Sequence, residues 1–245
     1  MTRHFFIAGA QRSGTTWLYR VLEQHPRIAM AQPLRPEPKF FIDDALYTKG
    51  LDHYREHYFP VDERDWFGEK STSYIEHPIA AERIARHFPD ALILFLLRDP
   101  VERAISNYRF SVDNGLESLP LEQALREEPD RCGPQAGISV SPHAYATRGH
   151  YVRYLDMWRE YFPPAQLLPL VSEKLMGSEA ALREVFGQLH LDVDVPLRDV
   201  ATPINSATIA LDDIALATRA ILRGTFRDSN RALADRYGVD TSRWQ

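Results

Sequence analysis

The chain has 245 residues, of which 44% are hydrophobic and 26% are charged, and its formal net charge is -5. These values are ordinary for a globular protein and exclude a disordered chain, and the acidic balance argues against general nucleic-acid binding. We expect residues 1–245 to form a single domain, because this length supports one substantial core. The longest apolar run, residues 91–97, is far shorter than the roughly 20 residues that a transmembrane helix needs.

Cys132 is the only cysteine, so neither an intrachain disulfide nor a cysteine-rich zinc site can form. The first residues, MTRHFFIAG, enter an apolar segment almost at once, which leaves no room for a signal peptide. We therefore expect a cytoplasmic protein without a transmembrane segment.

The first half of the chain alternates apolar strands with helices. Residues 4–9 form a short apolar run, and residues 15–25 then place apolar side chains at helical spacing. The segment 78–90 repeats the helical period, the buried strand 91–97 follows it, and another helix begins after Pro100. Strands that are apolar on both faces and alternate with helices predict a three-layer α/β/α fold with a mainly parallel central sheet.

The second half is predicted to continue this fold around one long loop. Gly, Pro and Ser are frequent in residues 129–143, which we interpret as a loop over the ligand-binding cleft. The later predicted elements are a helix at 151–162, a strand running into a turn at 165–175, a helix at 178–190, an irregular stretch at 192–206 and a mainly helical stretch at 208–237.

The loop after the first strand, GAQRSGTT, has the features of an anion cradle. A glycine-rich turn between a strand and a helix directs several backbone N–H groups and the positive end of the helix dipole at one point. Gly9 and Gly14 match the spacing of the phosphate-binding motif G-x-x-x-x-G-K-[ST], but Thr15 takes the lysine position and Arg12 lies inside the loop. Taken alone, the two glycines are also compatible with a simple tight turn.

Two further basic residues follow predicted strands. Arg98 comes directly after the strand 91–97 and Ser106 lies in the next helix, so a guanidinium and a hydroxyl are available where open α/β sheets bind ligands. The alternative for Arg98 is an ion pair with Asp99 or Glu102. Lys70 follows a short apolar segment in FGEKSTSY, and its alternative is a solvated surface position.

The ordered set of these motifs resembles the sulfotransferase family that uses 3′-phosphoadenosine 5′-phosphosulfate. The motif order is most similar to the heparan-sulfate and carbohydrate branch, in a bacterial-type single domain with a P-loop-like sulfotransferase fold. The stretches that carry the resemblance are FFIAGAQRSGTTWLYRVLEQHP at 5–26, PEPKFF at 36–41, FGEKSTSY at 67–74, LILFLLRDPVERAISNYRF at 92–110, RGHYVRYLDMWREYFP at 148–163 and FRDSNRALADRYGVDTSRW at 226–244.

The resemblance implies a role for each matching residue. It implies that the 5′-phosphosulfate is bound by Arg12, Ser13, Gly14, Thr15 and Thr16, and the 3′-phosphate by Arg98 and Ser106. It further implies that Lys70 approaches the sulfuryl group, and that Arg148 and Tyr151 help close the nucleotide site. The donor is a co-substrate, and the implied scheme needs no metal ion.

Sulfuryl transfer to an alcohol also needs a base, and Glu37 is the best candidate because PEPKFF resembles the family element that carries a carboxylate. Positioning and electrostatic stabilisation carry most of such a transfer, and Arg12 and Lys70 are expected to stabilise the charge that grows on the leaving phosphate. Lys39 stands where this branch usually has His, which leaves a histidine base open as the alternative. The histidines considered are His25, His53, His57, His143 and His150.

Two other functions stay open from the sequence. A metal-dependent P-loop small-molecule kinase would share the glycine spacing, although Thr15 replaces its lysine. A non-catalytic nucleotide-binding domain would share the whole loop. For a sulfotransferase, the expected acceptor is a carbohydrate or small molecule that offers a hydroxyl or, as the second choice, an amine.

Overall fold

The computed structural model describes residues 2–59, 64–132, 141–198, 200 and 216–244, and its centre is a five-stranded sheet in the order β2-β3-β1-β4-β5. Every neighbouring pair of strands is parallel. The strands are β1 (Arg3–Gly9), β2 (Ile28–Met30), β3 (Trp66–Lys70), β4 (Leu92–Leu97) and β5 (Leu167–Val171).

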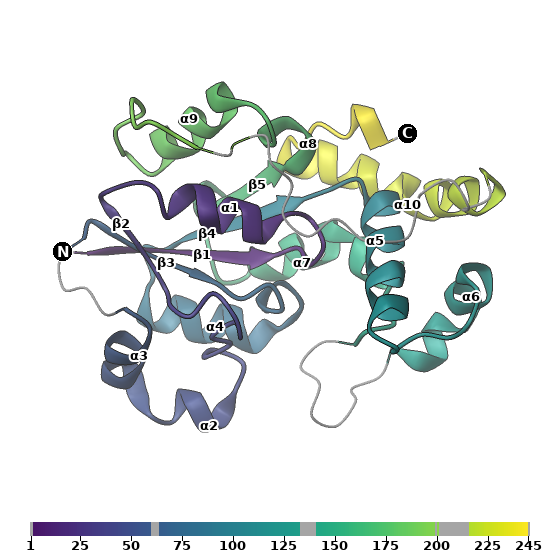
Figure 1. Cartoon of the computed structure of the whole chain (residues 1–245), viewed down its shortest axis with the longest axis horizontal. Helices are drawn as coiled ribbons and strands as arrows, with labels where there is room; N and C mark the ends of the chain where they lie inside the picture. Colours follow the sequence, from purple (N-terminus) through teal and green to yellow (C-terminus); the bar gives the residue numbers. More distant parts are fainter. Residues whose placement is uncertain (1, 60–63, 133–140, 199, 201–215, 245) are drawn as a thin grey trace.

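Helices cover both faces of this sheet (Figure 1). The α-helices are α1 (Thr15–Leu22), α2 (Asp44–Tyr47), α3 (Gly50–Tyr58), α4 (Pro78–His87), α5 (Pro100–Asp113), α6 (Leu121–Arg131), α7 (Tyr151–Trp158), α8 (Ser172–Leu175), α9 (Glu179–Gln188) and α10 (Leu216–Tyr237). Side chains of β1 alternate between the two faces: Phe6 and Ala8 pack in the core with α4 and α7, whereas Phe5 and Ile7 pack with α1 and α9. The predicted three-layer α/β/α fold with a parallel sheet is confirmed.

The register of the strands brings three chain segments to one edge of the sheet. Ile7 of β1 lies opposite Lys70, the last residue of β3, and Gly9 lies opposite Phe95 of β4. The segments that leave β1, β3 and β4 therefore begin side by side, at the end of the sheet toward which the β1 arrow points in Figure 1.

Several predicted elements are shorter in the structure, and some were missed. The helix expected at 151–162 ends at Trp158, and the turn expected after β5 is the short helix α8. β2 was not predicted because three residues are too few for a recognisable period, and α2 and α3 were missed because their sequences are largely polar. The parts of the predicted stretches 192–206 and 208–237 that fall at 199, 201–206 and 208–215 lie outside the described residues.

The predicted loop at 129–143 was partly wrong, because α6 continues through Pro129 to Arg131. A proline in a helix removes one backbone hydrogen bond, and local sequence therefore favours a break. Here the buried Glu128 carboxylate accepts hydrogen bonds of 2.7 Å from the N–H groups of both Ala146 and Thr147, so tertiary contacts hold the end of the helix. Residues 133–140 of the predicted loop lie outside the described residues.

Gly68 gives a test of how tightly β3 is packed. A Cβ atom at this position would lie 2.2 Å from Cζ of Phe5 and 2.5 Å from Sδ of Met30, so Gly68→Ala should lower the free energy of unfolding by roughly 1–3 kcal/mol. Urea denaturation measures this change. The matched control is Gly187→Ala in α9, where a Cβ meets nothing within 4 Å and the helix should gain up to about 1 kcal/mol. Equal unfolding midpoints for the two variants would contradict the packing argument.

Candidate functional site

The loop between β1 and α1 turns through two residues with left-handed backbone angles. Arg12 and Gly14 both have positive φ angles, 69° and 90°, and Ala10 N–H is fixed to the carbonyl of Leu96 at 2.8 Å. Gly14 is the N-cap of α1 and provides no side-chain cap, so the first-turn N–H groups of this helix have no capping side chain. Such an uncapped helix start after a glycine turn favours an anion. A side chain at Gly14 would also collide with Met176, whose Cε lies 2.3 Å from a would-be Cβ.

Arg12 joins this loop to the segment after β4. Its Nε donates to Oγ of Ser106 in α5 at 3.2 Å, and its guanidinium lies 4.9 Å from the centre of the Phe110 ring. Nη1 of Arg98 is 3.5 Å from the Arg12 carbonyl oxygen. Burial, followed by the positive charges of Arg98 and Arg35, lowers the pKa of Arg12, which indicates a site that favours an incoming negative charge.

The alternative ion pair of Arg98 is not formed among the described residues. The carboxylate of Asp99 accepts from Val101 N–H at 2.9 Å and so caps α5, while Glu102 pairs with Arg219 of α10. Arg98 therefore lies beside the loop, and its role in binding a ligand stays a prediction.

Tyr151 and Arg148 reach the same edge from the start of α7 and the turn before it. The Tyr151 hydroxyl donates to the Arg98 carbonyl at 2.8 Å, and full burial raises its pKa to about 12, so it is a neutral donor at physiological pH. The guanidinium of Arg148 is buried and its partners come from several segments. They are Glu76, Gln11 Oε1 at 3.1 Å, Asn107 Oδ1 at 3.0 Å and the Ser141 carbonyl at 3.0 Å.

Glu37 and Lys70 form an ion pair at the end of β3. The Lys70 side chain is only 3% exposed and that of Glu37 17%, so Lys70 does not occupy the solvated surface position that the sequence left open. Thr72 supports the same carboxylate, because its N–H donates to Glu37 Oε2 at 2.9 Å and its hydroxyl lies 3.0 Å from the same oxygen. A backbone N–H, a hydroxyl and an ammonium group therefore orient one carboxylate.

The candidate histidines have their contacts elsewhere. His25 is buried, with Nε2 3.1 Å from the Asp192 carbonyl and Nδ1 accepting from Arg27 N–H, and burial lowers its pKa. His53 and His57 stack on each other on α3. His143 lies beside Glu117, and His150 packs on Phe226.

The sequence missed Gln11, Asn107 and Glu76 as part of this site. They tie Arg148 to the loop, to α5 and to the turn after β3. Gln11 and Asn107 stand next to Arg12 and Ser106 in the sequence, so proximity to a motif residue was the only available signal.

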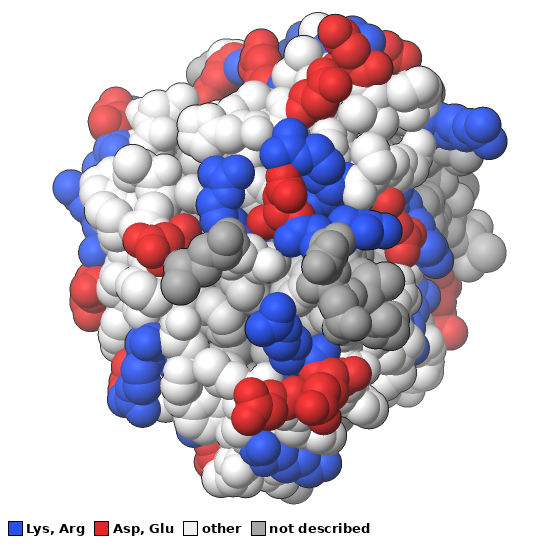
Figure 2. Space-filling view, turned by 90° about the vertical axis from the view of Figure 1, so that its left-hand side faces the viewer, with Lys and Arg blue, Asp and Glu red and all other residues white. Residues whose placement is uncertain are grey.

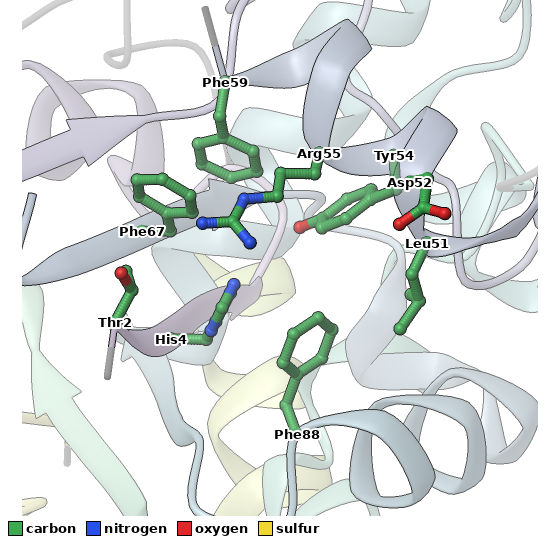
Figure 3. Close-up of a pocket in the computed structure, with 9 residues that line it drawn as sticks. All are labelled: Thr2, His4, Leu51, Asp52, Tyr54, Arg55, Phe59, Phe67 and Phe88. Atoms are coloured by element: carbon green, nitrogen blue, oxygen red, sulfur yellow. The ribbon is translucent and has the colours of Figure 1, made fainter. Parts of the chain in front are cut away.

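A cavity of about 490 Å³ lies at the other edge of the sheet, near the amino ends of β1 and β3 (Figure 3). Its lining includes aromatic rings together with Arg55 and Asp52. The face beyond these amino ends carries interleaved basic and acidic side chains (Figure 2). The loop, Arg98 and Lys70 are not part of this region, so the predicted site residues and the cavity are separate features.

A parallel α/β sheet with a glycine-bounded loop that enters a helix at its carboxyl edge defines a class of α/β proteins with an anion-binding loop. Within that class, residues 2–177 match the family model described as "Sulfotransferase domain". The chain therefore belongs to the sulfotransferase family, which supports sulfuryl transfer as its chemistry.

Curated relatives match half to three quarters of this chain. The human bifunctional heparan sulfate N-deacetylase/N-sulfotransferase 3 is 30% identical over 190 residues, which cover 74% of this chain and 21% of that protein. The membrane-associated sulfotransferase kil1 of Dictyostelium discoideum is 32% identical over 136 residues, covering 52% of this chain and 28% of that protein. The chain thus spans 21% and 28% of the length of these two relatives. No helix in the described part of this chain is long and apolar enough to cross a membrane.

Solved structures share the fold. A sulfotransferase from Alicyclobacillus acidocaldarius superposes with a TM-score of 0.81 at 24% identity, covering 100% of this chain and 99% of that one. Mouse sulfotransferase SULT7A1 complexed with PAP superposes with a TM-score of 0.59 at 13% identity, covering 94% of this chain and 85% of that one.

The buried ion pair predicts an asymmetric effect on stability. Lys70→Met leaves the carboxylate of Glu37 mostly buried without its cation, so the free energy of unfolding should fall by roughly 1–3 kcal/mol. The control is Lys174→Met, which removes an exposed pair with Asp240 and should barely move the urea midpoint. A comparable loss in both variants would show that the Lys70 pair contributes no more than a surface pair.

Proposed function

We propose that the chain transfers the sulfuryl group of 3′-phosphoadenosine 5′-phosphosulfate to a hydroxyl or amine of a carbohydrate or small-molecule acceptor. The observation that carries this proposal is the hydrogen bond from Arg12 to Ser106, two residues 94 positions apart in the chain. It joins an anion loop at a helix start to a second basic segment after β4. Two adjacent anion sites suit a nucleotide that carries charged groups at both its 5′ and 3′ positions.

The proposed donor site follows from these two segments. The loop residues would hold the 5′-phosphosulfate through backbone N–H groups, hydroxyls and the Arg12 guanidinium; they are Arg12, Ser13, Gly14, Thr15 and Thr16. Arg98 and Ser106 would hold the 3′-phosphate, while Arg148 and Tyr151 would support the loop and Arg98 from behind. The fold that the chain shares with a mouse sulfotransferase complexed with PAP supports the choice of this donor, and the residue roles stay predictions. That residues 1–245 act as one domain stays a prediction.

Glu37 and Lys70 would carry the transfer itself. As the acceptor oxygen attacks sulfur, a new S–O bond forms, the bond from sulfur to the bridging phosphate oxygen breaks, and Glu37 takes the acceptor proton. The electron pair of the broken bond stays on the 5′-phosphate of 3′-phosphoadenosine 5′-phosphate. Arg12, Lys70 and the loop N–H groups would stabilise that growing charge. Before reaction, Lys70 and Thr72 hold the carboxylate of Glu37 in a fixed orientation.

The acceptor class rests on the relatives. The matched human, bovine, mouse and frog proteins are named bifunctional heparan sulfate N-deacetylase/N-sulfotransferases, so glycans with an amino group are the first acceptors to test. Because the chain spans only 21% of the first of these proteins, we propose the glycan class and no particular glycan. Both an amine and a hydroxyl acceptor belong in the test.

Nucleotide selectivity tests the donor. In a thermal-shift assay, 3′-phosphoadenosine 5′-phosphate should raise the Tm more than ATP with magnesium does, because ligand that binds only the folded state stabilises it. The 3′-phosphate contacts predict a sharper result. Arg98→Met should weaken the binding of 3′-phosphoadenosine 5′-phosphate by about tenfold or more, while the affinity for AMP, which has no 3′-phosphate, should change little.

Isothermal titration calorimetry measures both affinities, and Arg86→Met on the exposed side of α4 is the control. A larger Tm shift with ATP and magnesium would favour the kinase alternative. Equal losses of affinity for both nucleotides would reject the assignment of the 3′-phosphate site.

Glu37 is tested by a conservative substitution. Glu37→Gln keeps the shape of the side chain but removes its basicity, so transfer should fall by about 10²- to 10⁴-fold while 3′-phosphoadenosine 5′-phosphate still binds. The assay follows radiolabelled sulfate from the donor to a chitooligosaccharide, its N-deacetylated form and 4-nitrophenol. Near-normal turnover of Glu37→Gln would exclude Glu37 as the base and favour the alternative of a histidine base.

A further inference from the structure

Glu69 is a buried carboxylate beside the proposed base that takes no part in the chemistry described above. It precedes Lys70 in β3, so the two side chains point to opposite faces of the sheet. Glu69 is only 1% exposed, and an acidic residue is seldom buried without partners. Its partners are three hydroxyl groups: Ser71 at 2.6 Å, Tyr54 of α3 at 2.7 Å and Tyr74.

The directions of these hydrogen bonds follow from the number of protons. An ionised carboxylate only accepts hydrogen bonds. Each hydroxyl therefore uses its one O–H group to donate to Glu69, and its oxygen remains available to accept a hydrogen bond from another group. The Ser71 oxygen accepts from Lys39 N–H at 2.9 Å, and the Tyr74 oxygen accepts from Phe41 N–H at 3.1 Å. Ionised Glu69 thus sets two hydroxyls to hold the backbone of residues 39–41.

The same segment carries Glu37. Its carboxylate is bound by Lys70 and Thr72, while the backbone just after it is bound by Ser71 and Tyr74. We propose that Glu69 is a positioning residue for sulfuryl transfer, which fixes residues 37–41 through Ser71 and Tyr74 so that Glu37 meets the acceptor. This proposal rests on the proposed function of Glu37.

Protonation of Glu69 would disturb this arrangement. Three hydroxyl groups already donate to the carboxylate, and protonation of Glu69 adds a fourth O–H donor that needs an acceptor. One hydroxyl must then rotate, so that a backbone N–H of residues 39–41 can lose its acceptor. Burial, together with the smaller effect of the nearby charge of Glu37, raises the pKa of Glu69 to about 7, and the hydrogen bonds from the three hydroxyls oppose this rise. The other titratable groups facing it are Tyr54, Tyr58 and Tyr74, whose pKa values are all raised, so they stay neutral near pH 7.

Activity and stability should therefore depend on pH in opposite directions. The positioning form is ionised, so transfer should decline as the pH falls through about 7. The pKa of Glu69 in the folded protein lies above its ordinary value of 4.5. The contribution of Glu69 to the free energy of unfolding is therefore complete below pH 4.5 and is lost as the pH rises through about 7.

The test compares the wild type with Glu69→Gln and Tyr54→Phe. Glu69→Gln should lower kcat about tenfold at pH 8, remove the step near pH 7 from the kcat profile and leave the affinity for 3′-phosphoadenosine 5′-phosphate unchanged. Tyr54→Phe removes one donor that lowers the pKa of Glu69, so the midpoint of the kcat profile should move to higher pH. The Tyr54 ring, which lines the cavity of Figure 3, is retained in this variant, and Tyr54 has no contact with the segment 39–41 through its hydroxyl.

Hydrogen exchange measures the positioning without any turnover. In the wild type, the protection factor of the peptide containing Lys39 and Phe41 should rise between pH 6 and pH 8, whereas in Glu69→Gln it should be low at both. If the wild type transfers no sulfate, the proposed function fails and hydrogen exchange still decides the role of Glu69. Should Glu69→Gln not fold, Tyr54→Phe provides the test through the midpoint of its kcat–pH profile and the hydrogen exchange of residues 39–41. An unshifted midpoint in Tyr54→Phe, or full protection with an unchanged kcat profile in Glu69→Gln, would overturn the proposal.

Discussion

Parallel pairing of β3, β1 and β4 is the constraint on which the rest of the site depends. Parallel strands end at the same edge, so the residues that follow each strand are neighbours in space although they are far apart in the chain. The pairs Ile7 with Lys70 and Gly9 with Phe95 fix how far each strand extends. A shift of one residue in β3 would turn Lys70 toward the other face and put Glu69 in its place. The register therefore decides which of two adjacent charged residues faces Glu37.

Much of the fold and of the site's outline could be predicted from the sequence, because both depend on local patterns. Apolar runs such as 91–97 mark buried strands, and the next residue, Arg98, is then placed at the sheet edge by topology alone. The glycine spacing of the β1–α1 loop likewise predicts its turn, and the structure adds positive φ angles at Arg12 and Gly14. Glu37 came from the resemblance of its segment to a family element, since nothing in the local pattern of PEPKFF indicates a buried carboxylate.

What could not be predicted depends on how side chains are oriented in the packed structure. Glu69 looks like a surface residue in any local pattern, yet hydroxyl groups of Tyr54 in α3, Ser71 and Tyr74 surround its carboxylate, and only the packed structure turns them toward it. The continuation of α6 through Pro129 has the same origin, since Glu128 is held by N–H groups near residue 146. In both cases a tertiary hydrogen bond outweighs the local preference, and a short window of sequence does not reveal that hydrogen bond.

The buried guanidinium of Arg148 affects how much conformational entropy the site would lose when a ligand binds. Its hydrogen bonds to Gln11, Asn107 and Glu76 join the β1–α1 loop, α5 and the turn after β3 through one buried side chain. A site assembled in advance loses little conformational freedom on binding, so more of the interaction energy remains as affinity. Arg148 thus contributes to preorganisation of the site, because it fixes the positions of the residues that it binds.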